Sequence, residues 1–161
     1  MISREVPYSF ISARHKLSWI ALILGLQEGW LSKQDALENC ASLDIPDEAR
    51  LPEGPCSAED FLAYLKENAS LDSAQISDAR LSWLRILMAW IFENRNEMND
   101  PLACVEQLYA DFGYPDEIYD LVRFNVPSGE YRPQDHTIQQ NHDRFMKMWE
   151  LYCKEHMPVA S

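Results

Sequence analysis

The sequence predicts an all-α fold, with about seven helices in a single compact domain over residues 1–161. Three observations predict this class. Apolar residues recur three and four positions apart along most of the chain, strand-like alternation is nearly absent, and the breaks between apolar stripes are short. Of the 161 residues, 47% are apolar, which is enough for a sizeable core. Short connections favour antiparallel packing of neighbouring helices.

Two short helices are expected near the start of the chain. Ser18 can cap a helix over residues 19–28, and Gly29 can end that helix in a left-handed turn. The pattern Ser32-x-x-Asp35 has the spacing of a capping box, which predicts that a second helix follows almost immediately.

The middle of the chain holds a loop and then the strongest helical pattern. The second helix is expected to end near Leu43, and residues 44–55 contain three prolines and one glycine, which predicts a surface loop before a helix that restarts at Ser57. The pattern from about Asp78 to Asn94 predicts the central and most buried helix. Its apolar stripe consists of Trp83, Ile86, Leu87, Trp90 and Ile91. The two tryptophans are interpreted as core residues rather than as residues that flank a ligand.

Helix signals continue through the second half. Asp100 is a predicted N-cap before Pro101, and Gly113 is expected to stop that helix. Pro115 is expected to open another helix to about Phe124.

The last part of the chain predicts an irregular stretch followed by a long helix. Residues 125–133 lack helical spacing, which predicts irregular structure, and the alternative is a single short β-ribbon. The last helix is expected over Asp135–His156, with an inward face made by Ile138, Phe145, Met148, Trp149 and Tyr152. Its outer face offers two ion pairs at the i, i+4 spacing, Asp143 with Lys147 and Glu150 with Lys154.

The charge balance limits the classes of partner. The chain has 26 Asp and Glu residues against 14 Lys and Arg residues, and its formal net charge is −12. Such a field repels phosphate backbones, so direct nucleic-acid binding is not expected and a basic protein partner is favoured.

The sequence predicts a cytoplasmic protein that does not enter a membrane. The most apolar run, residues 19–26, is far shorter than the ~20 residues of a spanning helix. The four cysteines have no regular spacing, which suits reduced side chains in the core. A disulfide between Cys40 and Cys56 is the alternative.

Two histidine patterns raise the alternative of a metal site. His142 and Asp143, with His136 six residues earlier, resemble the metal-binding dipeptide of helical phosphohydrolases, so a metal-dependent hydrolase is the alternative function. Such a site needs further His and Asp ligands, and the favoured interpretation is a polar helix face without metal. Cys153 and His156 could supply at most half of a zinc site, because ligands along one helix cannot converge on one ion.

The most unusual stretch is residues 109–120, which packs four acids and four aromatic residues around a turn between two helices. Asp116 and Glu117 lie in the predicted first turn of a helix, where the dipole favours a carboxylate by ~0.3–1 kcal/mol. Asp111 instead lies in the predicted last turn of the preceding helix, where the dipole opposes a carboxylate. Glu106 and Asp120 add like charge nearby if the two helices fold against each other. A local rule broken without visible compensation is where function is expected, and the alternative is an acidic corner that is simply solvated.

Several segments around this stretch resemble an uncharacterised family of small bacterial proteins with a D-P-L-x-x-V-E-x-x-Y-A-D-F-x-Y-P-x-E-I core. The matching segments are Asp100-Pro101-Leu102, Val105-Glu106, Tyr109-Ala110-Asp111-Phe112, Tyr114-Pro115, Glu117-Ile118 and Val126-Pro127. The likeness spans roughly residues 10–130. Proteins of this kind are similar to the small acidic immunity proteins encoded beside bacterial polymorphic and contact-dependent toxins. The resemblance implies a cytoplasmic protein that binds the catalytic domain of its cognate toxin and needs no cofactor.

The sequence therefore predicts a non-enzymatic protein-binding inhibitor, an immunity protein for a bacterial toxin such as a nuclease with a basic cleft. The alternatives are the metal-dependent hydrolase and a structural or adaptor domain. The residues expected to contact the basic partner are Glu106, Asp111, Tyr114, Asp116, Glu117 and Asp120.

Overall fold

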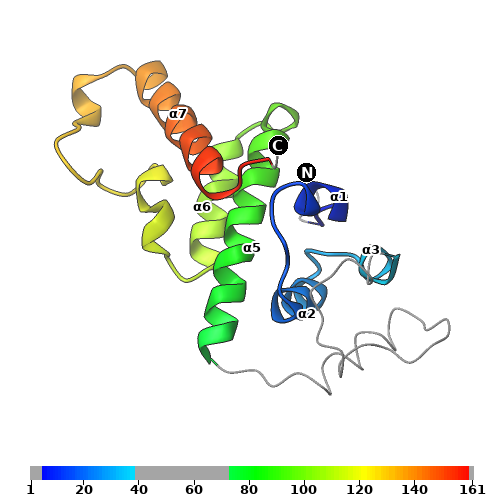
Figure 1. Cartoon of the computed structure of the whole chain (residues 1–161). Coiled ribbons are helices and arrows are strands. Elements are labelled where there is room, and N and C mark those ends of the chain that lie inside the picture. Colours follow the sequence, from blue (N-terminus) through cyan, green and yellow to red (C-terminus); the bar gives the residue numbers. More distant parts are fainter. Residues whose placement is uncertain (1–4, 39–72, 160–161) are drawn as a thin grey trace. The chain divides into compact units, whose positions relative to one another are not determined.

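The computed structural model describes residues 5–38 and 73–159, and within them every regular element is helical (Figure 1). The prediction of an all-α fold is confirmed. The chain forms two compact units. One holds Met88–Pro158, and the other holds the described residues before Met88 together with Val159. The expectation of one domain over the whole chain stays a prediction.

The unit that holds the residues before Met88 begins with three helices, α1 (Tyr8–Ser12), α2 (Trp19–Glu28) and α3 (Lys33–Glu38). The predicted boundaries of α2 are confirmed. The Ser18 hydroxyl accepts a hydrogen bond from the Ala21 N–H at 3.1 Å, and Gly29 ends the helix at φ 77°. The left-handed turn costs glycine little because glycine has no Cβ.

Helix α3 begins where the sequence predicts it. The Ser32 hydroxyl accepts from the Asp35 N–H at 2.9 Å, and the Asp35 carboxylate accepts from the Tyr8 N–H at 3.0 Å, which joins α3 to α1. The expected end near Leu43, the loop at 44–55, the helix after Ser57 and the Cys40–Cys56 disulfide lie outside the described residues.

Helix α5 (Ser73–Glu93) includes the long helix predicted from Asp78, and it already covers the first described residues before Asp78. Its apolar stripe is buried as predicted, although Trp90 is only half-buried. Trp83 is fully buried, donates its indole N–H to the Ala21 carbonyl at 2.6 Å, and packs on Trp30. This confirms Trp83 as a core residue.

The second unit contains the end of α5, the 3₁₀ helix η3 (Arg95–Glu97) and helix α6 (Pro101–Asp111). The predicted start of α6 is confirmed, because the Asp100 carboxylate accepts from the Ala103 N–H. Trp149 is buried against the end of α5, where its indole N–H donates to the Met88 carbonyl at 3.1 Å.

The helix expected from Pro115 to Phe124 was predicted wrongly in type and length. The structure has a 3₁₀ helix, η4 (Asp116–Leu121), which packs against both α6 and the last helix, α7 (Ile138–His156). Ile118 and Leu121 are its buried residues. Side chains three positions apart eclipse in a 3₁₀ helix, so this tighter winding buries both in one short turn.

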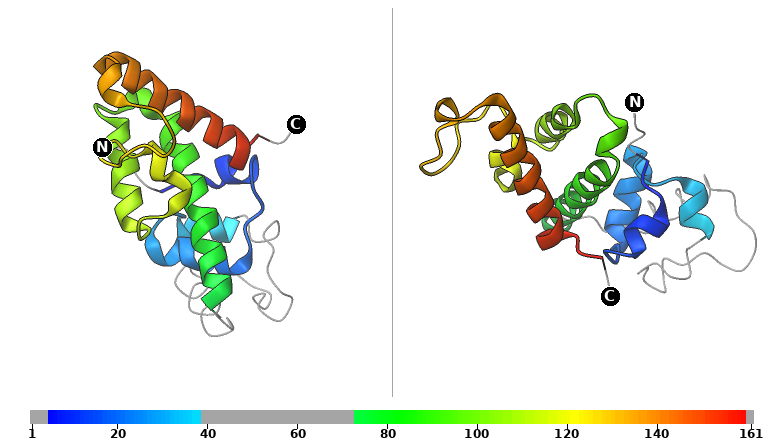
Figure 2. Two further views of the ribbon diagram at one scale, coloured as in Figure 1. Left: turned by 90° about the vertical axis from the view of Figure 1, so that its left-hand side faces the viewer. Right: turned by 90° about the horizontal axis from the view of Figure 1, so that it is seen from above.

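The last helix, α7 (Ile138–His156), begins three residues later than predicted, after the 3₁₀ helix η5 (Pro133–Asp135). Thr137 and Gln140 form a capping box that fixes this start. Ile138, predicted to face inward, is 90% exposed, because the core does not extend as far as the first turn of α7. Residues 125–133 contain no strand, and they form part of a loop beside the N-terminal end of α7 (Figure 2).

One of the two predicted ion pairs on α7 is present. Lys154 lies 2.9 Å from the Glu150 carboxylate, which confirms that pair. Asp143 accepts a hydrogen bond from Gln139 at 2.8 Å rather than pairing with Lys147. Among the described helices, none is both long and apolar enough to cross a bilayer.

Candidate functional site

The turn between α6 and η4 has two consecutive residues with left-handed backbone. Gly113 has φ 76° and Tyr114 has φ 61°, and Tyr114 is the only non-glycine residue with positive φ among the described ranges 5–38 and 73–159. The Tyr114 N–H donates to the Tyr109 carbonyl at 2.7 Å, which closes the end of α6. A left-handed conformation costs a non-glycine residue roughly 1–2 kcal/mol. The glycine stop was predicted from sequence, and the strained tyrosine was not.

The ring of Tyr114 is presented to solvent by this turn. It is 63% exposed and rests edge-on against the buried ring of Tyr109, with centroids 5.3 Å apart. The ring of Tyr109 also lies 6.1 Å from that of Phe124, which is 64% exposed. One buried tyrosine therefore supports two exposed aromatic side chains.

Glu106 is bound within the chain. Its carboxylate accepts two hydrogen bonds from the Arg123 guanidinium, at 3.0 Å from Nε and 2.5 Å from Nη2, and Arg123 Nη2 also lies 3.0 Å from Asp100. One arginine therefore joins two carboxylates of the α6 region to the segment after η4.

The charges around Arg123 shift two pKa values. Partial burial would raise the pKa of Asp100, but hydrogen bonds from Arg123 and the Ala103 N–H, with the charges of Arg123 and His142, hold it below its ordinary value. Burial would lower the pKa of Arg123, but its two carboxylate partners raise it. Both groups are consequently ionised over the physiological pH range.

Glu117 and Asp120 also have partners within the chain. The Tyr152 hydroxyl donates to Glu117 at 2.7 Å, which links η4 to α7. Asp120 accepts from the N–H of Ser128 at 2.9 Å and from its hydroxyl, which closes the turn after η4. These contacts hold the shape of the corner.

Asp111 and Asp116 are the exposed carboxylates that flank Tyr114. Asp111 accepts a hydrogen bond from Gln107 at 2.9 Å, one turn earlier on α6. The structure therefore places the six predicted residues around one helical corner, with Asp111, Tyr114 and Asp116 most exposed and the other three carboxylates in internal contacts.

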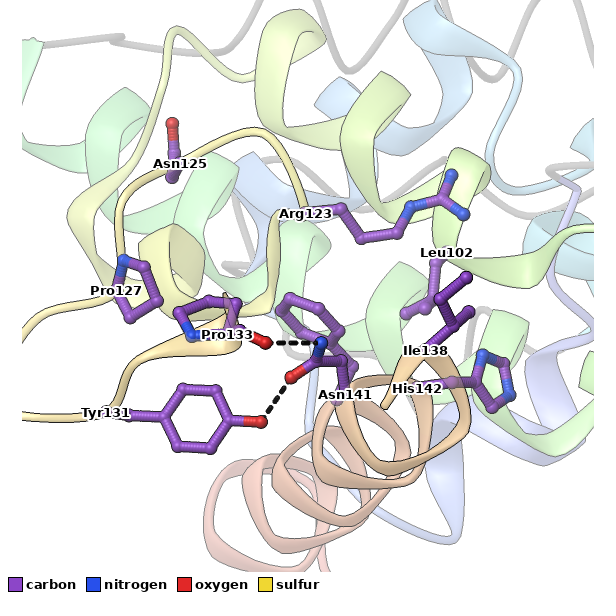
Figure 3. Close-up of a pocket in the computed structure, with 10 residues that line it drawn as sticks. Leu102, Arg123, Asn125, Pro127, Tyr131, Pro133, Ile138, Asn141 and His142 are labelled. Atoms are coloured by element: carbon purple, nitrogen blue, oxygen red, sulfur yellow. Dashed lines mark hydrogen bonds between the residues drawn. The ribbon is translucent and has the colours of Figure 1, made fainter. Parts of the chain in front are cut away.

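A pocket that the sequence did not predict lies beside the N-terminal end of α7. Its volume is about 280 Å³, and α6, α7 and the segment between η4 and α7 contribute its walls (Figure 3). The residues that line it are Leu102, Arg123, Asn125, Pro127, Tyr131, Pro133, Ile138, Asn141, His142 and Phe145. Most of this lining is apolar, and Arg123 and His142 lie on the same side in the close-up. Because three separate segments form it, no local sequence pattern could have revealed it.

The histidines of the alternative metal site have other surroundings. The ring of His136 stacks on Tyr131, with centroids 4.7 Å apart, while His142 lines the pocket. His156 packs against the ring of Tyr152. Within 5–38 and 73–159, no three His, Cys, Asp or Glu side chains are grouped so that they could hold a metal ion.

Comparison with known proteins assigns the chain to a family. No curated protein and no solved structure matches it significantly. The model of one family, described as "Uncharacterized protein conserved in bacteria (DUF2247)", matches residues 8–157. The predicted resemblance to uncharacterised bacterial proteins is confirmed at this level, and the link to immunity proteins stays a prediction. The chain belongs to the bacterial family DUF2247.

Proposed function

We propose that this protein is a non-enzymatic inhibitor, an immunity protein that binds the basic catalytic domain of a bacterial toxin such as a nuclease. One observation carries the proposal. At the corner between α6 and η4, a strained backbone presents the ring of Tyr114 between the exposed carboxylates of Asp111 and Asp116.

The strain at Tyr114 supports a binding role. Glycine would adopt φ 61° at little cost, whereas tyrosine loses roughly 1–2 kcal/mol there. The ring does not recover this by burial, because it is 63% exposed. Tyrosine supplies a large, rigid contact area with a polar hydroxyl, which is why it is frequent among residues that dominate interface energies.

The distribution of charge supports a basic partner. Residues 99–137 contain eight carboxylates and two arginines, a net charge of −6, which is half of the −12 of the whole chain. Such a field attracts a basic domain over long range and can raise the association rate constant to about 10⁸–10⁹ M⁻¹s⁻¹ at low salt. The acidic side chains would then occupy the positions in the toxin's basic cleft that bind the phosphates of its substrate.

The contacts in the corner divide its residues into those that would contact the partner and those that hold the corner in shape. Asp111, Tyr114 and Asp116 are the proposed contact residues. Glu106, Glu117 and Asp120 keep the corner in shape through Arg123, Tyr152 and Ser128, and they add to its negative potential.

The proposal is tested with the toxin domain encoded beside the gene, expected as the short basic C-terminal domain of a large secreted protein. Wild-type protein is expected to abolish the toxin's activity at equimolar concentration. The double variant Asp111→Asn/Asp116→Asn is expected to bind at least about tenfold more weakly at low salt, because two charges at the interface are lost.

A matched control comes from α7. Asp143 is exposed and accepts from Gln139 at 2.8 Å, as Asp111 accepts from Gln107 at 2.9 Å, and Glu155 is a second exposed acid on the same helix. Asp143→Asn/Glu155→Gln removes the same net charge elsewhere and is expected to bind nearly as the wild type does. If both double variants weaken toxin binding equally, the assignment of the corner as the contact region is wrong. Failure of the wild type to bind or inhibit the toxin would overturn the function.

A further inference from the structure

We infer that the pocket beside the start of α7 is an anchor site that receives one large apolar side chain from a basic segment of the partner. This inference rests on the proposed function, which it extends by naming a second contact region and the chemistry that fills it. Three properties of the pocket carry it: an apolar stripe that continues beyond the core, walls that are already fixed, and an acidic setting.

The apolar stripe of α7 extends past the core that it covers. Trp149 and Tyr152 are buried, Phe145 is half-buried, and Ile138 is 90% exposed. Ile138 and Phe145 lie two turns apart on the same helical face, and both line the pocket. A partner side chain in the pocket would cover the part of this stripe that the chain itself leaves open, which removes apolar surface from water.

The wall opposite α7 is held in place without a ligand. Asn141 donates to the Pro133 carbonyl at 3.1 Å and accepts from the Tyr131 hydroxyl (Figure 3). The Tyr131 ring stacks on the His136 ring and also contacts the Arg144 guanidinium, whose central carbon is 3.8 Å from the ring centroid. Because these contacts order the wall beforehand, a ligand loses little affinity to ordering it.

The size of the pocket favours a single side chain. A volume of about 280 Å³ lies at the lower end of the roughly 300–1,000 Å³ of common small-molecule sites. Leucine, methionine and aromatic side chains fit this scale, and such anchors in pockets are typical of the residues that dominate protein interfaces.

The acidic side chains near the pocket favour a basic partner segment around the anchor side chain. The guanidinium of Arg123, which lines the pocket, is shared by the carboxylates of Glu106 and Asp100, so these three side chains together have a net negative formal charge. Six of the ten residues that line the pocket belong to residues 99–137, the stretch of net charge −6. Lysine or arginine residues beside the anchor would therefore be attracted, and acidic ones repelled.

Residues 124–127 connect the corner around Tyr114 to the pocket along the chain. Tyr109 contacts both Tyr114 and Phe124, and Pro127, three residues after Phe124, lines the pocket. Val126, between them, is 78% exposed. A partner on the corner would therefore meet the exposed side chains of Phe124 and Val126 next to the pocket residue Pro127, within the same unit.

The decisive variant is Ile138→Ser. Ile138 is exposed, so the change removes an apolar pocket wall with little effect on folding. We expect binding to the toxin domain to weaken by about tenfold or more, mainly through faster dissociation. The matched control is Leu151→Ser, which changes an exposed apolar residue of the same helix that does not line the pocket. It is expected to leave the dissociation constant within about twofold of the wild type.

A second measurement does not need the toxin. The ¹⁵N-labelled full chain is titrated with the peptide Lys-Lys-Leu-Trp-Lys-Lys, with its Ala-for-Leu-and-Trp analogue, and with its Glu-for-Lys analogue. Saturable shifts are expected at the amides of Ile138, His142 and Tyr131 with the first peptide alone, and Ile138→Ser is expected to weaken them.

The outcomes separate the two proposals. If the wild type binds the toxin and Ile138→Ser binds as tightly, the anchor pocket is wrong and the function stands. If the wild type does not bind the toxin, the function fails. Absence of saturable shifts at the pocket, or equal shifts with the acidic peptide, overturns the inference by itself.

Discussion

Tyr114 joins a strained backbone to an exposed ring, which makes it the most informative single residue of the corner. Its φ of 61° follows directly on the left-handed Gly113, so two residues share the reversal at the end of α6. The sequence predicts the glycine because helices commonly stop there, but it gives no local reason for a second left-handed residue.

Replacing Tyr114 with glycine separates stability from binding. Tyr114→Gly relieves roughly 1–2 kcal/mol of backbone strain and loses about 0.5–1.5 kcal/mol of ring contact with Tyr109. The free energy of unfolding in urea is therefore expected to change by less than about 1 kcal/mol, while toxin binding weakens. Tyr114→Ala, which keeps the strain and loses the ring, is expected to be less stable than Tyr114→Gly. The reverse order of the two variants would contradict this account.

Gly25 is required because the Trp83 ring leaves no room for a side chain, and not because of its backbone conformation. A Cβ atom at this position of α2 would lie 2.2 Å from Cζ2 of the buried Trp83 ring. Gly25→Ala is therefore expected to destabilise the chain by about 1–3 kcal/mol, as overpacking does. A glycine in an open helix position would give the opposite sign, since alanine there stabilises by roughly 0.5–1 kcal/mol. Urea unfolding monitored by tryptophan fluorescence measures the sign.

His15 gives the chain a pH-dependent stability. The pKa of His15 lies below its ordinary value of 6.5, first because of burial and second because Arg85 repels the imidazolium. The unfolded chain therefore takes up the proton at a higher pH than the folded chain. The contribution of His15 to stability is fully present above its ordinary pKa of 6.5, and it is lost as the pH falls through the lowered pKa of the folded chain.

The measurement is the free energy of unfolding between about pH 7.5 and pH 5, a window around the ordinary histidine pKa. It is expected to fall toward acid in the wild type and to fall less steeply in His15→Asn. Arg85→Gln is expected to have an intermediate slope, because it removes only the second cause. Identical slopes in all three proteins would exclude His15 as the origin.

At the scale of elements, the capping residues fix where the helices begin. Ser18, Asp100 and Thr137 each accept a backbone N–H at the start of a helix. The first two were predicted. Thr137 was missed because residues 135–156 read as one continuous helical pattern, although Thr137 and Gln140 have the spacing of a capping box.

Thr137→Ala is expected to destabilise the chain by about 0.5–2 kcal/mol, because α7 loses the side chain that accepts its Gln140 N–H. Thr137→Ser keeps the hydroxyl and is expected to remain close to the wild type. Thermal unfolding followed by circular dichroism compares the two variants. An alanine variant as stable as the serine variant would show that the cap contributes little.

At the scale of the whole molecule, the net charge of −12 is the property most closely tied to the proposed partner. Half of it lies within residues 99–137, in the unit that also contains the Tyr114 corner and the pocket. The positions of the acids relative to two possible contact regions could not be known until η4 and the following segment were placed.

Ionic strength tests this charge directly. Raising the salt concentration from about 0.05 M to 0.5 M is expected to slow association with the basic toxin domain by about tenfold or more, because exposed charges are screened beyond a few ångströms. Dissociation is expected to change much less, since it depends on the aromatic and apolar contacts. Stopped-flow fluorescence separates the two rate constants, and an association rate that ignores salt would contradict electrostatic capture.

The sequence by itself determined the helical class, the start of three helices and the two glycine stops, because hydrophobic spacing, caps and left-handed glycines act within a few residues of chain. It also located the acidic corner. Tertiary structure decided what those residues do: Arg123 joins Glu106 to Asp100, Ser128 binds Asp120, and Ile138 lies outside the core. Each of these facts depends on which distant segment packs alongside. The helical period of an apolar pattern also does not show how far along the helix the core of the protein extends.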